Sequence, residues 1–193
     1  MIKYFKNTNM KKLAFILISI ALFSNSSKGQ KYITKEGIIE IFSQTSLFTI
    51  EAKNQKVASI LNSENGEIVS STLVRSFKFK EALVEEHFNE NYMESHEFPK
   101  SVFKGKITNF SNVDLKKNGT YNITIEGALT MHGETHPLKT EGKLIVNGDN
   151  IKANTEFLIS LEKYKIEVEE NYKDRIKDEI KLIVHFNYSK MNK

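Results

Sequence analysis

Hydrophobic and polar residues alternate most regularly over residues 119–147. From Tyr121 to Met131 the odd positions are apolar or glycine, and the even positions between them are mostly polar. A period of two is typical of a strand that buries one face. Gly133 breaks the alternation, and a second alternating run begins at Pro137. Two such runs joined by a short loop with Gly and Pro predict a long antiparallel hairpin.

Alternation returns in three further segments. Each of them places apolar residues on one face and polar or charged residues on the other, so each predicts another half-buried strand. They are residues 101–110, 151–161 and 179–189.

The strands nearer the start of the chain are less clear. Residues 67–78 predict a strand whose inward face carries either Ile68 and Val74 or Val69 and Leu73. Residues 31–61 are apolar at irregular spacing, which predicts two or three short strands without assigned faces.

One segment, residues 79–92, has a different period. Phe79 and Leu83 are four residues apart, as are Val84 and Phe88, and glutamates occupy much of the rest. This spacing predicts one amphipathic helix, lying across one end of a barrel. The helix is either a packing cap, which the pattern favours, or a mobile lid.

Together these elements predict a mainly β fold of eight or nine antiparallel strands with one helix, and a charge-rich connection over residues 162–178. A sheet of this size closes to hide its edges. We therefore expect an eight-stranded antiparallel barrel with the helix packed near one end. About eight strands enclose either packed side chains or one small ligand.

The first 29 residues have the layout of a secretory signal. A basic stretch ends at Lys12, an apolar run of eleven residues spans Leu13 to Phe23, and small and polar residues follow up to Gly29. Eleven residues reach ~16 Å as a helix, too short for a ~30 Å hydrocarbon core. We predict a signal peptide over residues 1–29, removed on export, and one domain over 30–193 that is not an integral membrane protein after cleavage.

The charge of the chain does not indicate a nucleic-acid partner. Of the 28 Lys and Arg residues, five lie in the leader, so the remainder has 23 against 24 Asp and Glu. The formal charge of +4 therefore comes from the leader, and no nucleic-acid partner is expected. The chain has no cysteine, which excludes disulfides and a lipoprotein anchor.

Four segments resemble one family. They are the Phe-Pro segment 98–105, the hairpin 127–138 with its Leu-Thr-Met-His-Gly-Glu-Thr-His-Pro run, the helical segment 77–88, and the segment 157–164 with the strand that follows it. Over roughly residues 73–188 the chain resembles the YceI-like exported bacterial proteins, which are often described as polyisoprenoid-binding. The family's usual first-strand His-Ser pattern is absent.

The resemblance implies a lipocalin-like barrel, a periplasmic location, a possible homodimer and an apolar channel that holds an isoprenoid or similar lipid. It implies a non-enzymatic binding or carrier protein. The apolar faces of the strands supply the expected lining of the channel: Phe103, Gly105, Ile107, Ile123, Ile125, Gly127, Leu129, Gly142, Leu144, Phe157, Ile159, Val184 and Phe186.

Three of these lining positions are glycines, and Ala153 holds a comparable place. Glycine inside a strand is destabilising, so its repetition on an apolar face needs a cause. One cause is bending where the barrel closes. The other is volume, because a glycine leaves the lumen open for an alkyl chain. We expect both, with Gly127 at the most sensitive position.

Catalytic and metal-binding patterns are absent from the sequence. His132 and His136 have the four-residue spacing of a helical zinc site, but Gly133 and Pro137 make a helix there improbable. We therefore predict structural roles for both histidines, with no metal and no cofactor. Two alternatives stay open: a lipid-modifying enzyme that uses the same barrel, and a structural or interaction module with a filled core.

Overall fold

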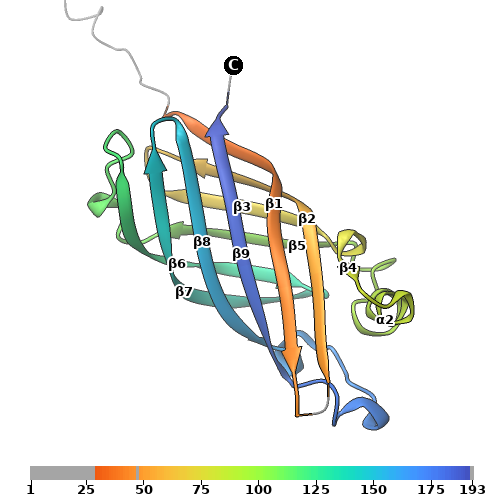
Figure 1. Cartoon of the computed structure of the whole chain (residues 1–193). Coiled ribbons are helices and arrows are strands. Elements are labelled where there is room, and N and C mark those ends of the chain that lie inside the picture. The colour runs from red at the N-terminus through yellow and green to blue at the C-terminus, as the bar shows by residue number, and fades with distance from the viewer. Residues whose placement is uncertain (1–28, 47, 192–193) are drawn as a thin grey trace, which may run out of the picture.

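Eight antiparallel strands close into a barrel in the computed structural model, which describes residues 29–46 and 48–191 (Figure 1). Neighbours around the barrel follow the order β1-β9-β8-β7-β6-β5-β3-β2, and pairing of β1 with β2 closes it. The predicted fold is therefore confirmed. The strands are β1 (Lys31–Gln44), β2 (Thr49–Asn62), β3 (Glu67–Leu73), β5 (Lys100–Ile107), β6 (Gly119–Met131), β7 (Glu134–Asn147), β8 (Asn150–Ser160) and β9 (Glu179–Lys190).

Smaller elements lie outside the ring of eight strands. A two-residue strand, β4 (Lys78–Phe79), pairs with β2. The α-helix α2 (Ala82–His87) continues as a π-helical turn, η2 (Phe88–Tyr92). The remaining helical turns are short 3₁₀ segments: η1 (Val74–Ser76), η3 (Phe110–Asn112), η4 (Glu162–Tyr164) and η5 (Glu170–Tyr172).

The first two strands are longer than the sequence predicts. Instead of two or three short strands, residues 31–62 form two strands of 14 residues each. Register shifts on either side of Gly37 interrupt their pairing. Such shifts move side chains from one face to the other, so a strict period of two cannot persist along the sequence.

β3 resolves the ambiguity in its inward face. Ile68 and Val74 are buried, whereas Val69 and Leu73 are exposed. The strand ends at Leu73 rather than continuing to Lys78, because the chain enters the turn η1 there.

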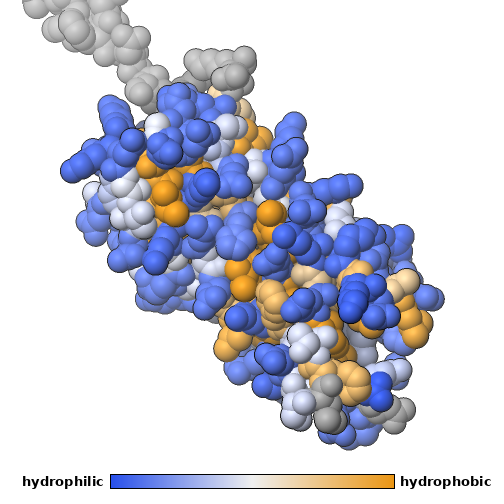
Figure 2. Space-filling model, in the orientation of Figure 1, coloured by the Kyte–Doolittle hydropathy of each residue, from blue (hydrophilic) through white to orange (hydrophobic). Residues whose placement is uncertain are grey.

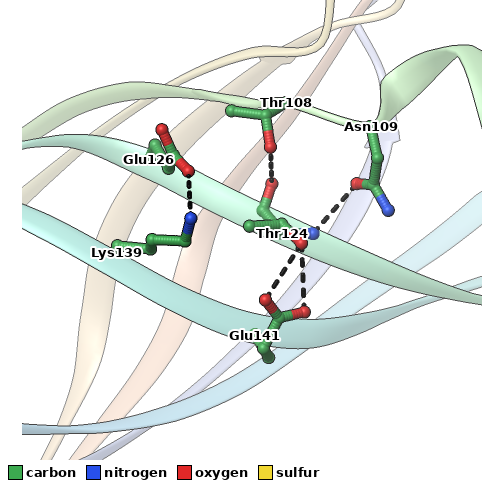
Figure 3. Close-up of polar contacts among 6 residues, drawn as sticks. All are labelled: Thr108, Asn109, Thr124, Glu126, Lys139 and Glu141. Atoms are coloured by element: carbon green, nitrogen blue, oxygen red, sulfur yellow. Dashed lines mark hydrogen bonds and ion pairs between the residues drawn. The ribbon is translucent and has the colours of Figure 1, made fainter.

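The β6–β7 hairpin is confirmed, and its turn consists of His132 and Gly133. Both have positive φ, 50° and 75°, as a two-residue type I′ hairpin turn requires. Cross-strand pairs on the outer face support the register: Lys139 Nζ lies 2.8 Å from Glu126 Oε1, and Thr124 Oγ1 donates to both Glu141 carboxylate oxygens at 3.0 and 3.1 Å (Figure 3).

Just beyond the end of β5, the Asn109 side chain makes a hydrogen bond to the backbone of β6. The Asn109 amide oxygen accepts from the Thr124 backbone N–H at 2.9 Å, while the Thr108 hydroxyl donates to the Thr124 carbonyl at 3.3 Å (Figure 3). These contacts hold the start of the 108–118 loop against β6.

The two ends of the barrel differ. The start of β1 and the end of β9 lie at one end, while α2 and the connection between β8 and β9 lie toward the other (Figure 1). The first end is filled: Phe110, Val113 and Leu115 of the 108–118 loop pack against a core that includes Ile107, Ile123, Leu144 and Ile151. We call it the packed end, and the other the helix end.

The outer wall is mostly hydrophilic in the view of Figure 2, with smaller hydrophobic areas. Alternation along the strands accounts for this, because most outward positions carry polar or charged residues. The apolar side chains are thereby concentrated inside the barrel.

Candidate functional site

A cavity of about 200 Å³ occupies the barrel between the packed core and the helix end. A cavity needs only about 10–15 Å³ on the same measure to hold one water molecule, so this space is more than ten times larger. The interior is therefore not filled, unlike the core of a purely structural barrel.

The lining of the cavity is apolar and uncharged. Among the described residues that line it, none is Asp, Glu, Lys, Arg or His. Most are aliphatic or aromatic, with a few hydroxyl and amide side chains between them. Every strand of the closed barrel contributes, with α2, η2 and the connection before β9.

Seven of the thirteen predicted lining residues lie on the cavity wall. The period of two identified their inward face correctly, and their strands bring them together from β5, β6, β8 and β9. They are Phe103, Ile125, Leu129, Phe157, Ile159, Val184 and Phe186.

The other six do not line the cavity. Three of them, Ile107, Ile123 and Leu144, point inward but lie in the packed end, where they are at most 2% exposed. The remaining three are the glycines Gly105, Gly127 and Gly142.

The glycines do not leave open volume. Gly105 and Gly127 pair directly across β5 and β6. A Cβ on Gly127 would lie 2.4 Å from the Lys104 carbonyl oxygen, 2.5 Å from Gly105 Cα and 2.7 Å from Phe103 Cζ. The space above the pair is thus taken by the Phe103 ring and by closely approaching backbone. These two glycines allow β5 and β6 to approach each other closely. The prediction that they leave lumen volume open for a ligand is wrong at these positions.

Gly142 has a similar explanation. A Cβ there would lie 2.7 Å from the Asn154 carbonyl oxygen and 3.2 Å from Thr155 Cβ. Ala153, in contrast, carries a side chain that lines the cavity itself.

The floor of the cavity holds one buried polar pair. The Tyr188 hydroxyl lies 2.7 Å from Ser59 Oγ, and Ser59 donates to the Val69 carbonyl at 3.2 Å. Since Ser59 gives its proton to Val69, Tyr188 donates to Ser59. Burial raises the pKa of the Tyr188 phenol, so the floor stays neutral at physiological pH.

The helical segment covers the cavity with one of the apolar pairs expected from its spacing, while the other side is exposed. Val84, Phe88 and Tyr92 line the cavity, whereas Leu83 is 62% exposed. The Phe88 ring packs against Phe79, with centroids 4.8 Å apart. Burial raises the pKa of the Tyr92 hydroxyl, which is therefore uncharged near the cavity at neutral pH.

One carboxylate attaches the helix to the barrel. Glu85 accepts hydrogen bonds from the Lys78 ammonium group and, at 3.2 Å, from the Phe79 backbone N–H. The hydrogen bond from Lys78 lowers the pKa of Glu85. Because Lys78 and Phe79 form β4, this contact connects α2 to the strand paired with β2.

Sequence reasoning missed most of the lining outside the regular strands. Ile39, Ile41 and Ile50 come from the hairpin whose faces could not be assigned, and Ile166 and Ile176 come from the charge-rich connection. Isolated isoleucines within an otherwise charged stretch were the available signal for these last two.

His132 anchors the β6–β7 turn at the helix end. Its Nδ1 lies 2.9 Å from the Tyr164 carbonyl oxygen, and its Nε2 lies 2.9 Å from Glu94 Oε2. A carbonyl only accepts, so Nδ1 is the donor of the first contact. The ring thereby joins the hairpin turn to two other segments, as the structural role predicted for it requires.

His136 makes a packing contact rather than a polar one. Its ring lies edge-on to Tyr164, with centroids 5.0 Å apart. Within residues 29–46 and 48–191, no group of three or more His, Cys, Asp or Glu side chains is arranged to hold a metal ion.

We expect His132→Asn to lower the free energy of unfolding by about 1–3 kcal/mol, because it removes two hydrogen bonds from a side chain that is 9% exposed. Asparagine tolerates the left-handed backbone conformation that His132 adopts. The measured loss of stability therefore comes from the contacts of the imidazole ring and not from backbone strain. Urea denaturation measures it, with exposed His96→Asn as the control. Equal unfolding midpoints for the two variants would contradict the anchoring role.

Fold and cavity together define an antiparallel barrel built around an apolar, uncharged lumen. The chain belongs to the YceI-like domain family, whose model matches residues 31–188. Comparison with curated protein sequences gives no significant match.

Solved structures of low sequence identity share the fold. A polyisoprenoid binding domain from Saccharophagus degradans, implicated in plant cell wall breakdown, has a TM-score of 0.74 at 11% identity, covering 85% of this chain and 100% of that one. BcnA of Burkholderia cenocepacia has a TM-score of 0.66 at 13% identity, with 79% and 96% covered. A Campylobacter jejuni YceI protein has a TM-score of 0.57 at 10% identity, with 74% and 85% covered.

In the described part of the chain, no helix is both long and apolar enough to span a bilayer. The predicted signal peptide lies outside the described residues, apart from Gly29.

Proposed function

We propose that this protein binds an isoprenoid, or a similar long apolar chain, inside the barrel and carries it without chemical change. The observation that supports this most directly is the cavity of about 200 Å³ with its uncharged, mostly apolar lining. Burial gains ~25 cal/mol per Å² of apolar area. About 400 Å² of buried prenyl chain would thus contribute ~10 kcal/mol before the cost of ordering it.

The comparisons with known proteins support a binding function without specifying the ligand. The chain belongs to the YceI-like family, and one protein with the same fold is described as a polyisoprenoid binding domain. At 11% identity that likeness concerns the fold, so the ligand assignment depends on the cavity of this chain.

A binding role is better supported than a catalytic one. Acid–base catalysis needs a side chain that can exchange a proton near neutral pH. The described lining residues include no histidine and no carboxylate, and burial keeps the Tyr188 phenol in its neutral form. The available chemistry is therefore apolar contact and neutral hydrogen bonding.

The location that we propose is the periplasm, on the basis of the basic, apolar and small-residue order of residues 1–29. N-terminal sequencing of mature protein from an exported fraction would test this. A chain that begins at Met1 and stays with the membrane would contradict it. The homodimer suggested by the family resemblance remains a prediction, for light scattering to test.

Protein purified without detergent from its native host should retain an apolar lipid in near-stoichiometric amount. Organic extraction and mass spectrometry would identify the lipid and give its ratio to protein. A second extraction after unfolding and refolding in lipid-free buffer is the control. Recovery of no long-chain lipid above that control would contradict the proposal.

A further inference from the structure

One wall of the cavity carries a group of hydroxyl side chains, Ser70, Thr72 and Ser101. Ser70 and Thr72 follow Ile68 on the inward face of β3, and Ser101 on β5 pairs directly with Thr72. All three line the cavity. We call this group the hydroxyl wall.

The hydroxyl wall faces the open cavity and has no hydrogen-bond partner within the described protein. Ser70 is 9% exposed and Thr72 is 5% exposed. Among the described residues, none makes a hydrogen bond to either side chain or to that of Ser101. Polar groups inside folded proteins are almost always hydrogen-bonded, to protein or to another molecule, so hydroxyls that face the cavity without a protein partner are available to a molecule bound there.

Several other polar side chains inside the barrel have partners within the protein. Tyr188 pairs with Ser59, as described above. Thr140 Oγ1 donates to the Glu156 carbonyl at 3.0 Å, and Thr155 Oγ1 donates to the Glu141 carbonyl at 2.7 Å. Among the barrel strands, the cavity-lining hydroxyls without a protein partner thus lie on β3 and β5.

The surroundings restrict the partner to an uncharged group. The described lining offers no cation to a phosphate, and an anion without a paired cation is strongly disfavoured in an apolar site. β8, four strands away around the barrel and therefore opposite β3, presents Phe157 and Ile159, and its polar lining residues Asn154 and Thr155 have partners within the protein. One side of the lumen suits hydrocarbon and the other suits a neutral polar group.

We propose that the bound chain carries an uncharged hydrogen-bonding group, such as a hydroxyl, carbonyl or amide, and that this group lies inside the cavity against Ser70, Thr72 and Ser101. This inference rests on the proposed lipid-binding function and specifies the chemical class of the ligand. A prenyl diphosphate or monophosphate is excluded by it.

Three probes of equal chain length test the proposal: farnesol, β-farnesene and farnesyl monophosphate. Delipidated protein is incubated with an equimolar mixture and repurified, and the bound compounds are quantified by mass spectrometry. Wild type should retain farnesol in preference to both others. In the triple variant Ser70→Ala, Thr72→Val, Ser101→Ala, the bound ratio of farnesol to farnesene should fall about tenfold, corresponding to ~1.4 kcal/mol.

The matched control is Ser71→Ala, on the same strand but outside the cavity lining; it should keep the wild-type ratio. Because the replaced hydroxyls have no protein partner, the triple variant should melt no lower than wild type without ligand. An unchanged ratio of farnesol to farnesene in a folded triple variant would contradict the proposed role of the hydroxyl wall but not the lipid-binding function. Preferred retention of farnesyl monophosphate by wild type would have the same meaning. Retention of none of the three probes by wild type would overturn the lipid-binding function and this inference with it.

Discussion

Replacing Gly127 with alanine should destabilise the barrel by about 3 kcal/mol, the upper part of the usual range for overpacking. The added Cβ would meet backbone atoms of β5 at 2.4 and 2.5 Å. A flexible side chain can rotate away from such a contact, but a strand that is paired on both edges cannot. Urea denaturation followed by circular dichroism would measure the change in the free energy of unfolding.

Gly119→Ala is the matched control on the same strand. A Cβ at Gly119 would have its nearest contact at 3.6 Å, with the Tyr121 ring. This replacement should be neutral or stabilise the protein by up to ~1 kcal/mol, because alanine restricts the unfolded chain. Equal unfolding midpoints for the two variants would show that β5 and β6 can separate, contrary to the close packing of Gly127 with Gly105.

Gly127 also shows how far a sequence pattern can reach. Alternation correctly places it on the inward face of β6, but alternation carries no information about the residue opposite. Only the pairing of β5 with β6 sets Gly127 against Gly105, and only then does Phe103 reach over both. A glycine on an apolar face therefore predicts either open volume or a close approach, and the register decides which.

The sequence pattern predicted which residues point into the barrel, but not how far along the barrel axis the cavity extends. Ile125 and Ile123 lie on the same face of β6, yet the first lines the cavity and the second is buried in the packed end. The difference arises from the 108–118 loop, which fills one end with Phe110 and Leu115. A period of two specifies the face of a strand and cannot specify where a distant loop packs.

Irregular segments account for the other part of the site that the sequence did not show. The shifts around Gly37 hide the inward face of β1, although Ile39 and Ile41 line the cavity. The inward face of the helical segment was predictable in part, because Val84 and Phe88 follow the expected spacing and Tyr92 lies four residues further on, in the π-helical turn. The long hairpin and the last strand were predictable because neither contains such an irregularity.

Ala153→Phe should reduce the amount of lipid retained per folded protein by about tenfold or more. Ala153 lines the cavity and lies between Leu144 and Phe186 on the neighbouring strands. A phenyl ring there would occupy space otherwise available to the chain. Each CH₂ group that no longer fits forfeits ~0.8 kcal/mol, so the loss of two groups already weakens binding about tenfold.

Ala58→Phe, on the exposed outer face of β2, is the matched control, because it adds the same ring outside the lumen. Both proteins would be loaded with farnesol under identical conditions, and bound lipid would be divided by folded protein. The inner substitution should also cost ~1–3 kcal/mol of stability through overpacking, so the comparison is made well below its melting temperature. Full retention by folded Ala153→Phe would mean that the lipid binds outside the barrel, since a chain inside the cavity must compete with the new ring for the same volume.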